Sequence, residues 1–336
     1  MTSKSFDLGR GDGYHFFRSQ LSRPILPPHG ISISGQTAIL TGSNTGLGFA
    51  CAKWLLELNV GRLIMAVRTP SKGEAAAAEL RKRHKGAQID VWQLDMLSYK
   101  SVQDFAAKCR TLDRLDIAIL NAGVIEQSFQ LGPQGHEKMF QVNYLSTVLL
   151  AFLLLPTLKE KSPRGHPGRL TIVGSCTAYF TELPYRGSNP FLSTFDDQSK
   201  FNTSEQYPAS KILAHFWILK LAERVKKEYV IVNLVDPGLV RGTEINRGVN
   251  PIIKMIFDTV MWGFGRTMRN GSSTYIDAAI LRGDETHGSY LMDWKIQPYA
   301  TPIYDSEGES LATRIWNETL AELAFANIEG ILSTMA

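Results

Sequence analysis

The chain has 336 residues, 44% of them hydrophobic, and a formal net charge of +4 at pH 7. A sizeable core is expected, and one domain is favoured over two because no Pro/Gly/Ser-rich linker or charge block divides the chain. The basic residues are dispersed, which argues against a nucleic-acid-binding or membrane-surface protein. The three cysteines lack CxxC or metal-binding spacing, so we expect reduced thiols, a cytoplasmic location and no metal site.

The first segment, residues 1–33, carries charges and glycines where a secretion signal requires an apolar core. We therefore expect a surface arm there. The longest apolar run, residues 148–158, is too short to span a bilayer and contains Pro156. It predicts a buried or interface helix.

Predicted strands and helices alternate from Gln36 to about residue 293, which is typical of a parallel sheet. We expect an α/β fold with a doubly wound parallel sheet of about seven strands and helices on both faces. Ser71 and Ser98 are candidate N-caps of the helices that follow the second and third strands. The predicted strands are residues 37–40, 63–67, 89–94, 115–120, 170–173, 230–235 and 289–292, and the clearest helices end near 58 or cover 72–84 and 205–225.

A glycine-rich turn, TGSNTGLG at residues 41–48, separates the first predicted strand from the first predicted helix. Such a turn lets backbone N–H groups and a helix N-terminus approach a pyrophosphate closely. A structural loop is the alternative, but the strand–turn–helix context favours a nucleotide site. The candidate cofactor-binding residues here are Gly42, Asn44, Thr45, Gly46, Leu47 and Gly48.

Arg68 ends the second predicted strand, 20 residues after Gly48. A carboxylate in this place would bind the ribose 2′-hydroxyl of NAD, whereas a guanidinium suits the 2′-phosphate of NADP by charge and by its bidentate shape. Lys72 adds to the positive field. Arg68 therefore predicts NADP(H) as the cofactor, and a solvated arginine at a strand end is the alternative.

Polar or small residues follow the other predicted strands, at the edge where such sheets bind ligands. The residues after the fourth strand either let the chain pass close to a cofactor or form a simple tight turn. Ser175 does not lie in a GxSxG nucleophile elbow, but a hydroxyl at a strand end can orient a substrate carbonyl. The strand-end candidates are Asp95, then Asn121, Ala122 and Gly123, then Ser175, and finally Pro237 and Gly238.

Tyr207 and Lys211 lie four residues apart in a predicted helix, so they share one face. A neighbouring cation favours the phenolate and brings a tyrosine toward the range where it acts as an acid near neutrality. A solvated helix pair is the alternative. Asn143 is an amide next to a strongly apolar stretch, and it either satisfies a helix distortion or serves a site.

Taken together, these motifs resemble the short-chain dehydrogenase/reductase family, and closely the retinol-dehydrogenase-like reductases of fungal secondary metabolism. The match covers about residues 33–322. Its motifs are residues 41–48, Asp95, residues 121–123, Asn143, Ser175, Tyr207 with Lys211, and Pro237 with Gly238. The resemblance implies a Rossmann-type fold in which residues 34–325 form one NADP-binding reductase domain.

The resemblance also implies roles for single residues. Tyr207 would protonate the developing alkoxide while hydride leaves the nicotinamide, and Ser175 would hold the carbonyl oxygen. Lys211 would lower the tyrosine pKa and bind the nicotinamide ribose. Asn143 would hold a water that links Lys211 to solvent, and Asp95 would contact the adenine. Further cofactor contacts are expected from Ala122, Pro237, Gly238, Val240 and Thr243.

Two departures from the family pattern stand out, one in the loop expected to contact the nicotinamide amide and one on the substrate side. Gly242 occupies the slot after the Pro-Gly pair where the family often has threonine, and Thr243 comes one residue later. The interval from Ser175 to Tyr207 is long and rich in aromatic residues, so we expect it to form part of the substrate entrance. Segments 176–204 and 243–268 are the expected lid or substrate segments. A dimer contact or an interfacial membrane helix is the alternative for residues 251–262.

The sequence thus predicts an NADPH-dependent carbonyl reductase or alcohol dehydrogenase. The expected substrate is a bulky apolar or aromatic, polyketide-like ketone or aldehyde of secondary metabolism. The alternatives are a non-redox descendant that serves as a cyclase or NADP-binding scaffold, and a cofactor-sensing regulator. The intact Ser-Asn-Tyr-Lys set argues against both, because neither needs the acid. A homodimer is compatible with the sequence.

Overall fold

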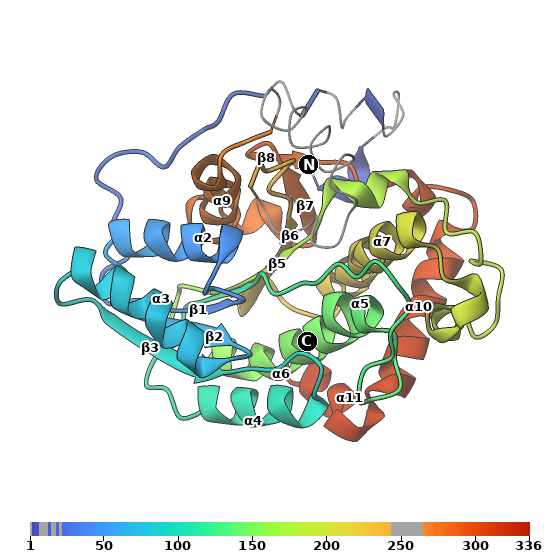
Figure 1. Cartoon of the computed structure of the whole chain (residues 1–336), viewed down its shortest axis with the longest axis horizontal. Helices are drawn as coiled ribbons and strands as arrows, with labels where there is room; N and C mark the ends of the chain where they lie inside the picture. The colour runs from blue at the N-terminus through green and yellow to red at the C-terminus, as the bar shows by residue number, and fades with distance from the viewer. Residues whose placement is uncertain (1, 7–12, 15–17, 20–21, 243–264) are drawn as a thin grey trace.

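The computed structural model describes residues 2–6, 13–14, 18–19, 22–242 and 265–336. Within these residues, eight strands form one sheet in the order β3-β2-β1-β4-β5-β6-β7-β8 (Figure 1). All neighbouring strands are parallel except β7 and β8. The predicted doubly wound sheet is confirmed, with one strand more than expected. The strands are β1 Thr37–Thr41, β2 Arg62–Val67, β3 Gln88–Gln93, β4 Ile117–Leu120, β5 Gly168–Val173, β6 Val230–Val235, β7 Ser289–Met292 and β8 Lys295–Gln297.

Helices cover both faces of the sheet and bury a separate core on each (Figure 1). One core packs under α2, α3 and α9, and the larger one packs under α4, α6, α7 and α10. A π-helix, Gln141–Leu145, joins α5 to α6. The helices are α2 Gly46–Glu57, α3 Pro70–Arg83, α4 Tyr99–Cys109, α5 Lys138–Phe140, α6 Ser146–Lys161, α7 Thr203–Ala222, α9 Met268–Ile276, α10 Gly308–Glu322 and α11 Ile328–Ser333.

The central strands are largely apolar because both of their faces are covered. In β1, Ile39 belongs to one core while Ala38 and Leu40 belong to the other, as the two-residue period of a strand requires. The same reason gives β4 its unbroken apolar sequence and β6 a sequence in which Asn233 is the single polar residue. The carboxyl ends of these strands meet at one edge of the sheet.

The unpredicted strand, β8, pairs with β7 through a two-residue turn at Asp293 and Trp294. Both turn residues have left-handed backbone angles, with φ of 59° and 58°. Asp-Trp lacks the glycine that usually marks such a turn, and β8 has only three residues. These two features explain why the sequence pattern did not reveal the hairpin.

The two predicted helix caps fare differently. The hydroxyl of Ser98 accepts a hydrogen bond from the Ser101 N–H at 3.2 Å, as predicted for the start of α4. The prediction for Ser71 is wrong, because α3 already begins at Pro70 and Thr69 occupies the cap position. Proline is favoured at the first position of a helix, where its missing N–H costs nothing.

The N-terminal arm is more than a surface segment. Its stretch from Arg23 to Leu26 is exposed, as expected. Ser3, however, is buried against β7, where its hydroxyl accepts from the Tyr290 N–H at 2.8 Å. Ser19 is also buried and donates to Asp293 at 2.6 Å. Two described points of the arm are therefore bound to the β7–β8 hairpin.

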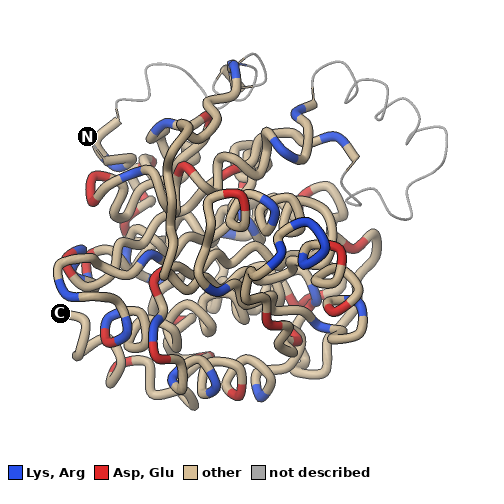
Figure 2. Tube along the Cα trace, turned by 90° about the vertical axis from the view of Figure 1, so that its left-hand side faces the viewer, with Lys and Arg blue, Asp and Glu red and all other residues tan. Residues whose placement is uncertain are grey.

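The helical run from Lys138 to Lys161 is long and apolar enough to cross a membrane by length and composition alone. In this structure, 89% of its most apolar window is buried inside the protein, which is the environment of a core helix. Charged residues of both signs are interspersed along the described chain (Figure 2).

Candidate active site

The glycine-rich turn closes tightly on itself between β1 and α2. Gly42 has a left-handed φ of +64°, and a Cβ on Gly48 would lie 2.2 Å from the Gly42 carbonyl oxygen. Neither position accepts a side chain. The cap residue of α2, Thr45, makes no side-chain cap hydrogen bond. The first N–H groups of α2 are therefore available to an anion such as a pyrophosphate.

Asn121 holds this turn from the end of β4. Its amide donates to the carbonyls of Thr41 and Gly42 at 2.9 and 3.2 Å, and the Tyr275 hydroxyl donates to its Oδ1 at 3.2 Å. The N–H of Ala122 donates to Thr41 Oγ1 at 2.9 Å. The side-chain groups of Asn121 are thus used to hold the glycine-rich turn in place. Asn121 therefore supports cofactor binding indirectly, through the shape of that turn.

Asn143 lies in the π-helix and bridges two elements of the site. Its amide donates to the Val124 carbonyl at 3.0 Å and to Ser210 Oγ on α7 at 3.1 Å, and its Oδ1 accepts from the Val124 N–H at 2.9 Å. A Cβ on Gly123 would lie 3.1 Å from Asn143 Oδ1 and 3.6 Å from Lys211 Nζ. Asn143 therefore lies near Lys211. It also joins the segment after β4 to α7, the helix that contains Lys211.

Ser175, Tyr207 and Lys211 converge at the end of β5. Ser175 lies close enough to the Tyr207 hydroxyl to lower the tyrosine pKa, and Ser175 Oγ accepts a hydrogen bond from Thr177 Oγ1 at 2.8 Å. Lys211 Nζ donates to the Val173 carbonyl at 3.1 Å and lies 5.8 Å from the centre of the Tyr207 ring. The helix spacing and the strand end thus bring a phenol, an alcohol and an ammonium into one site.

The titration of this group is governed by burial. Burial raises the pKa of Tyr207 above its ordinary value, and the hydrogen bond from Ser175 opposes the rise. Burial lowers the pKa of Lys211 to about 8, against the attraction of Asp236. The resemblance implied a tyrosine pKa lowered by Lys211, which stays a prediction, and the net upward shift here comes from burial. Tyr207 therefore carries its proton at neutral pH, as a proton donor must.

Asp236 is a member of the site that sequence reasoning missed. It follows β6 directly, is fully buried, and accepts from the Gly238 N–H. Burial raises its pKa to about 6, and its charge acts on both Tyr207 and Lys211. The available signal was a carboxylate placed immediately after a largely apolar strand, because a buried charge there needs partners.

The Pro237–Gly238 turn packs between α9 and the cofactor turn. Gly271 of α9 is so close that a Cβ there would lie 2.5 Å from Val240 and 3.1 Å from Leu47. The predicted cofactor residues after β6 therefore adjoin the glycine-rich turn. Thr243 and residues 243–264 of the expected lid lie outside the described residues.

The adenosine-side candidates lie at the ends of β2 and β3. Arg68 and Lys72 are both exposed. Asp95 accepts from the Leu97 N–H at 3.0 Å, which orients its carboxylate. These positions are open to a ligand, and they match the side of the fold where the sequence placed the adenosine.

The insertion between Ser175 and α7 differs from its expected role. Tyr179, Phe191 and Phe195 are at most 5% exposed. The hydroxyl of Tyr179 donates to the Pro298 carbonyl, and Phe195 stacks on Phe140 with ring centres 4.7 Å apart. These three rings belong to the core and do not line an entrance, while the expectation that the insertion forms part of the substrate entrance stays a prediction. Of its aromatic residues, Phe180 and Tyr185 are exposed.

Helix α10 holds the insertion in place. The Glu318 carboxylate accepts from the N–H groups of Phe191 and Leu192 at 2.9 and 2.7 Å. His136 lies between Asp196 of the insertion and Glu322 of α10, with nitrogen–oxygen distances of 2.8 and 2.9 Å. Burial alone would lower the pKa of His136, but its two carboxylate partners outweigh this and raise it to about 9.

Known structures share this architecture. The NADPH-dependent 3-quinuclidinone reductase of Rhodotorula rubra aligns with a TM-score of 0.58 at 23% identity, covering 80% of this chain and 95% of that one. RhlG of Pseudomonas aeruginosa aligns with a TM-score of 0.59 at 22% identity, covering 78% and 95%. At these identities the likeness establishes the fold alone.

Sequence comparison establishes the family. Residues 36–189 match the family model described as short chain dehydrogenase. The short chain dehydrogenase/reductase mfmJ of Annulohypoxylon moriforme is 47% identical over 95% of this chain and 94% of its own length. The short chain dehydrogenase virL of Hypocrea virens is 41% identical with the same coverage. The chain belongs to the short-chain dehydrogenase/reductase family. It is thus an oxidoreductase of CH–OH and C=O groups.

The residues of this short-chain dehydrogenase fit the family's nicotinamide cofactor. The close approach of Gly42 and Gly48 leaves backbone rather than side chains at the turn, as a dinucleotide requires. Ser43 Oγ is buried without a hydrogen-bond partner in the described structure, so the turn retains polar capacity. The nicotinamide end would lie near Lys211 and the Pro237–Gly238 turn.

Proposed function

We propose that the protein is an NADPH-dependent carbonyl reductase, or an alcohol dehydrogenase in the reverse direction. Its substrate is a bulky apolar or aromatic ketone or aldehyde of fungal secondary metabolism. The observation that carries this proposal is the convergence of Ser175, Tyr207 and Lys211 beside Asn143. A scaffold or a cofactor sensor would have no use for a proton donor next to a buried lysine.

The chain's own groups account for the proton side of the reaction. The bound cofactor supplies the hydride. Ser175 and Tyr207 offer two hydroxyls to one oxygen, so they stabilise the negative charge that grows on it in the transition state. Tyr207 then gives up its proton, and the ammonium of Lys211 stabilises the resulting phenolate. Asn143 keeps the surrounding segment fixed, so little rearrangement is needed during transfer.

The preference for NADPH rests on charge. Arg68 directly follows β2, Lys72 lies in the first turn of α3, and both side chains are exposed. A guanidinium binds a phosphate through two parallel hydrogen bonds, whereas it contributes little binding energy toward an uncharged hydroxyl. The 2′-phosphate of NADPH is the anion that matches this position.

The substrate class rests on the rim of the site. Phe180 ends the short helix that begins directly after Ser175, and 49% of its surface is exposed. Tyr185 is 40% exposed in the same insertion. Exposed aromatic side chains in the segment that follows Ser175 favour an apolar or aromatic ligand. The fungal relatives named short chain dehydrogenases, among them fogG of Aspergillus ruber, support the assignment to a fungal biosynthetic enzyme.

The test is NADPH oxidation with a panel of aromatic ketones and aldehydes of increasing size, with Tyr207→Phe as the matched control. Turnover that requires the tyrosine hydroxyl, and that is faster with large than with small carbonyl compounds, is expected. Tight NADPH binding without turnover of any carbonyl or alcohol in the panel would instead favour the scaffold or sensor.

A further inference from the structure

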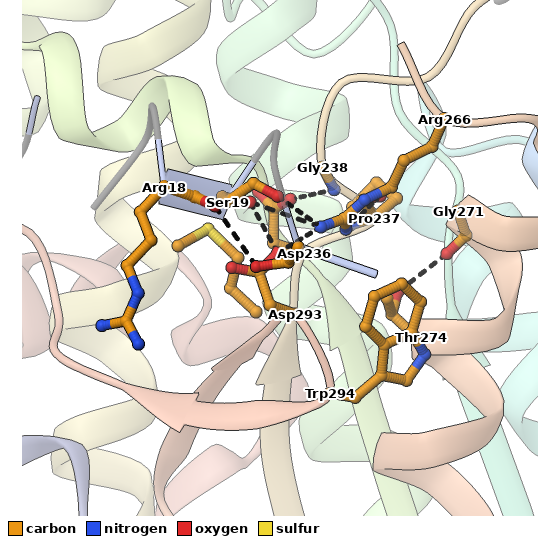
Figure 3. Close-up of polar contacts among 12 residues, drawn as sticks. Arg18, Ser19, Asp236, Pro237, Gly238, Arg266, Gly271, Thr274, Asp293 and Trp294 are labelled. Atoms are coloured by element: carbon orange, nitrogen blue, oxygen red, sulfur yellow. Dashed lines mark hydrogen bonds and ion pairs between the residues drawn. The ribbon is translucent and has the colours of Figure 1, made fainter. Parts of the chain in front are cut away.

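Arg266 is a buried arginine that joins three segments far apart in the sequence (Figure 3). Its Nη1 donates to the Pro237 carbonyl at 3.1 Å, and its Nη2 donates to the Ser19 carbonyl at 3.0 Å and pairs with Asp293. Ser19 Oγ donates to the same Asp293 oxygen at 2.6 Å. We call Ser19, Arg266 and Asp293 the arm latch. Arg266 and Asp293 are only 7% and 5% exposed.

The guanidinium lies directly against the Pro-Gly turn. A Cβ on Gly238 would be 2.6 Å from Arg266 Nη1 and 2.8 Å from its Cζ. Gly238 also has a left-handed φ of +74°, which disfavours any side chain. The guanidinium therefore occupies the space that a side chain would take, and the position of the turn depends on it.

Backbone pairing extends this contact beyond the turn. The Arg266 N–H donates to the Leu239 carbonyl at 2.8 Å, and the Arg241 N–H donates to the Arg266 carbonyl at 2.9 Å. Val240, which lies between them, packs against Gly271 next to Leu47 of the cofactor turn. A displaced Arg266 would therefore move residues that border the cofactor turn.

The geometry requires an arginine. The guanidinium is planar, lies 4.8 Å from the Trp294 ring, and reaches acceptors on three segments at once. A lysine ammonium has the charge but neither the flat shape nor the forked donors. Lysine at position 266 would keep the charge balance and lose the geometry, which makes it a useful variant.

Charges alternate in sign from the latch to the catalytic lysine. Arg266 favours the ionised form of Asp236, while Asp293 disfavours it. Asp236 in turn favours the charged form of Lys211. The latch therefore acts on the site through the turn and through the buried charges.

We propose that the arm latch positions the active site, with Arg266 setting the Pro237–Gly238 turn and the N-terminal arm completing the arrangement through Ser19. Arg266 is thus a positioning residue, and the N-terminal arm contributes to the active-site geometry through Ser19. The kinetic consequence rests on the proposed reductase function, whereas the coupling of arm and turn does not.

Hydrogen–deuterium exchange of the full-length protein tests the coupling without an assay of activity. Arg266→Lys should raise exchange together in the peptide that contains Ser19 and in the one that covers residues 238–241. Arg114→Gln is the matched control, because Arg114 pairs with Asp116 beside the N-terminal end of β1, at the opposite edge of the sheet. Faster exchange in only one of the two peptides, or in neither, would overturn the latch.

Kinetics separate positioning from mere stability. In Arg266→Lys we expect kcat to fall by about ten- to a hundredfold, as for a misplaced reacting group, while KM for NADPH changes less than about threefold. The double variant Arg266→Gln/Asp293→Asn removes both buried charges, so it should recover the thermal stability lost in Arg266→Gln alone. It should not recover kcat.

The outcomes remain distinct. If kcat recovers in step with the melting temperature, the latch is only structural and the proposal fails. If the wild-type enzyme turns over no carbonyl compound, the proposed function fails, and the exchange experiment still decides whether arm and turn are coupled.

Discussion

Asp236 is the buried carboxylate that favours the charged form of Lys211, whose pKa burial lowers to about 8. The two residues come from different elements, the end of β6 and the middle of α7. Burial is the larger influence on the Lys211 pKa, and Asp236 opposes it. We therefore expect the pH range of the enzyme to depend partly on a residue that does not touch the reacting atoms.

The first prediction concerns this pair. In the wild type, kcat/KM for NADPH should fall as the pH rises through about 8, because Lys211 loses its charge. Asp236→Asn removes the charge that opposes this loss, so the alkaline limb should move to lower pH. A pH–rate profile measures it, with Asp90→Asn, a substitution in the Arg62 ion pair of β2 and β3, as the control. An unmoved limb would contradict the assignment.

The second prediction concerns the proton donor. Tyr207→Phe should lower kcat by about 10²–10⁴-fold, the usual contribution of a general acid, while the dissociation constant of NADPH stays within about twofold. Lys211→Ala should damage both. Stopped-flow turnover and fluorescence titration of NADPH measure the two quantities separately. Near-normal kcat in Tyr207→Phe would reject the mechanism.

The third prediction concerns the cofactor. The enzyme should bind NADPH about ten- to a hundredfold more tightly than NADH, as expected for a charge-assisted contact to the 2′-phosphate. Arg68→Ala should remove most of this preference by weakening NADPH alone. Calorimetric titration with both cofactors decides it, and Arg110→Ala, at the end of α4, provides a surface control. A preference that survives in Arg68→Ala would exclude Arg68 as its source.

The fourth prediction concerns stability and pH. The pKa of His136 rises from 6.5 to about 9 on folding, so its contribution is fully present below pH 6.5 and is lost as the pH rises through 9. We expect a loss of about 1–2 kcal/mol over that window, after allowance for the partial exposure of its partners. Urea unfolding at pH 6 and pH 9.5 measures it. In His136→Gln, the change in the free energy of unfolding between the two pH values should be smaller. An equal change in the wild type and the variant would refute the assignment.

Local patterns predicted the parts of the site that are local. The four-residue spacing placed Tyr207 and Lys211 on one helix face. The glycine-rich turn could be recognised because it follows a predicted strand and precedes a predicted helix. Asp236 and Arg266 were missed because their partners are distant in the sequence. Ser19 and Arg266, for example, are 247 residues apart. The residue pattern within one segment gives no information about a contact with a residue so far away in the sequence.

Burial within the insertion was equally hidden from the sequence. Its aromatic residues suggested a substrate entrance, but aromatic residues are equally common in cores. What decides between the two is Glu318 of α10, which binds the backbone at Phe191 and Leu192 more than 120 residues earlier in the chain. The arrangement of α10 over the insertion could be seen only in the folded protein.

The position of Ser19 also has a consequence for how the chain folds during synthesis. Ser19 leaves the ribosome early, whereas Arg266 and Asp293, which bind it, are made near the end of translation. Ser19 therefore cannot bind Arg266 and Asp293 until almost all of the strands of the sheet have been synthesised. Contacts of such long range form late because the entropy of closing the intervening loop must first be overcome. A nascent chain that stalls before residue 293 would contain Tyr207 and Lys211 and still lack Asp293, to which Ser19 binds.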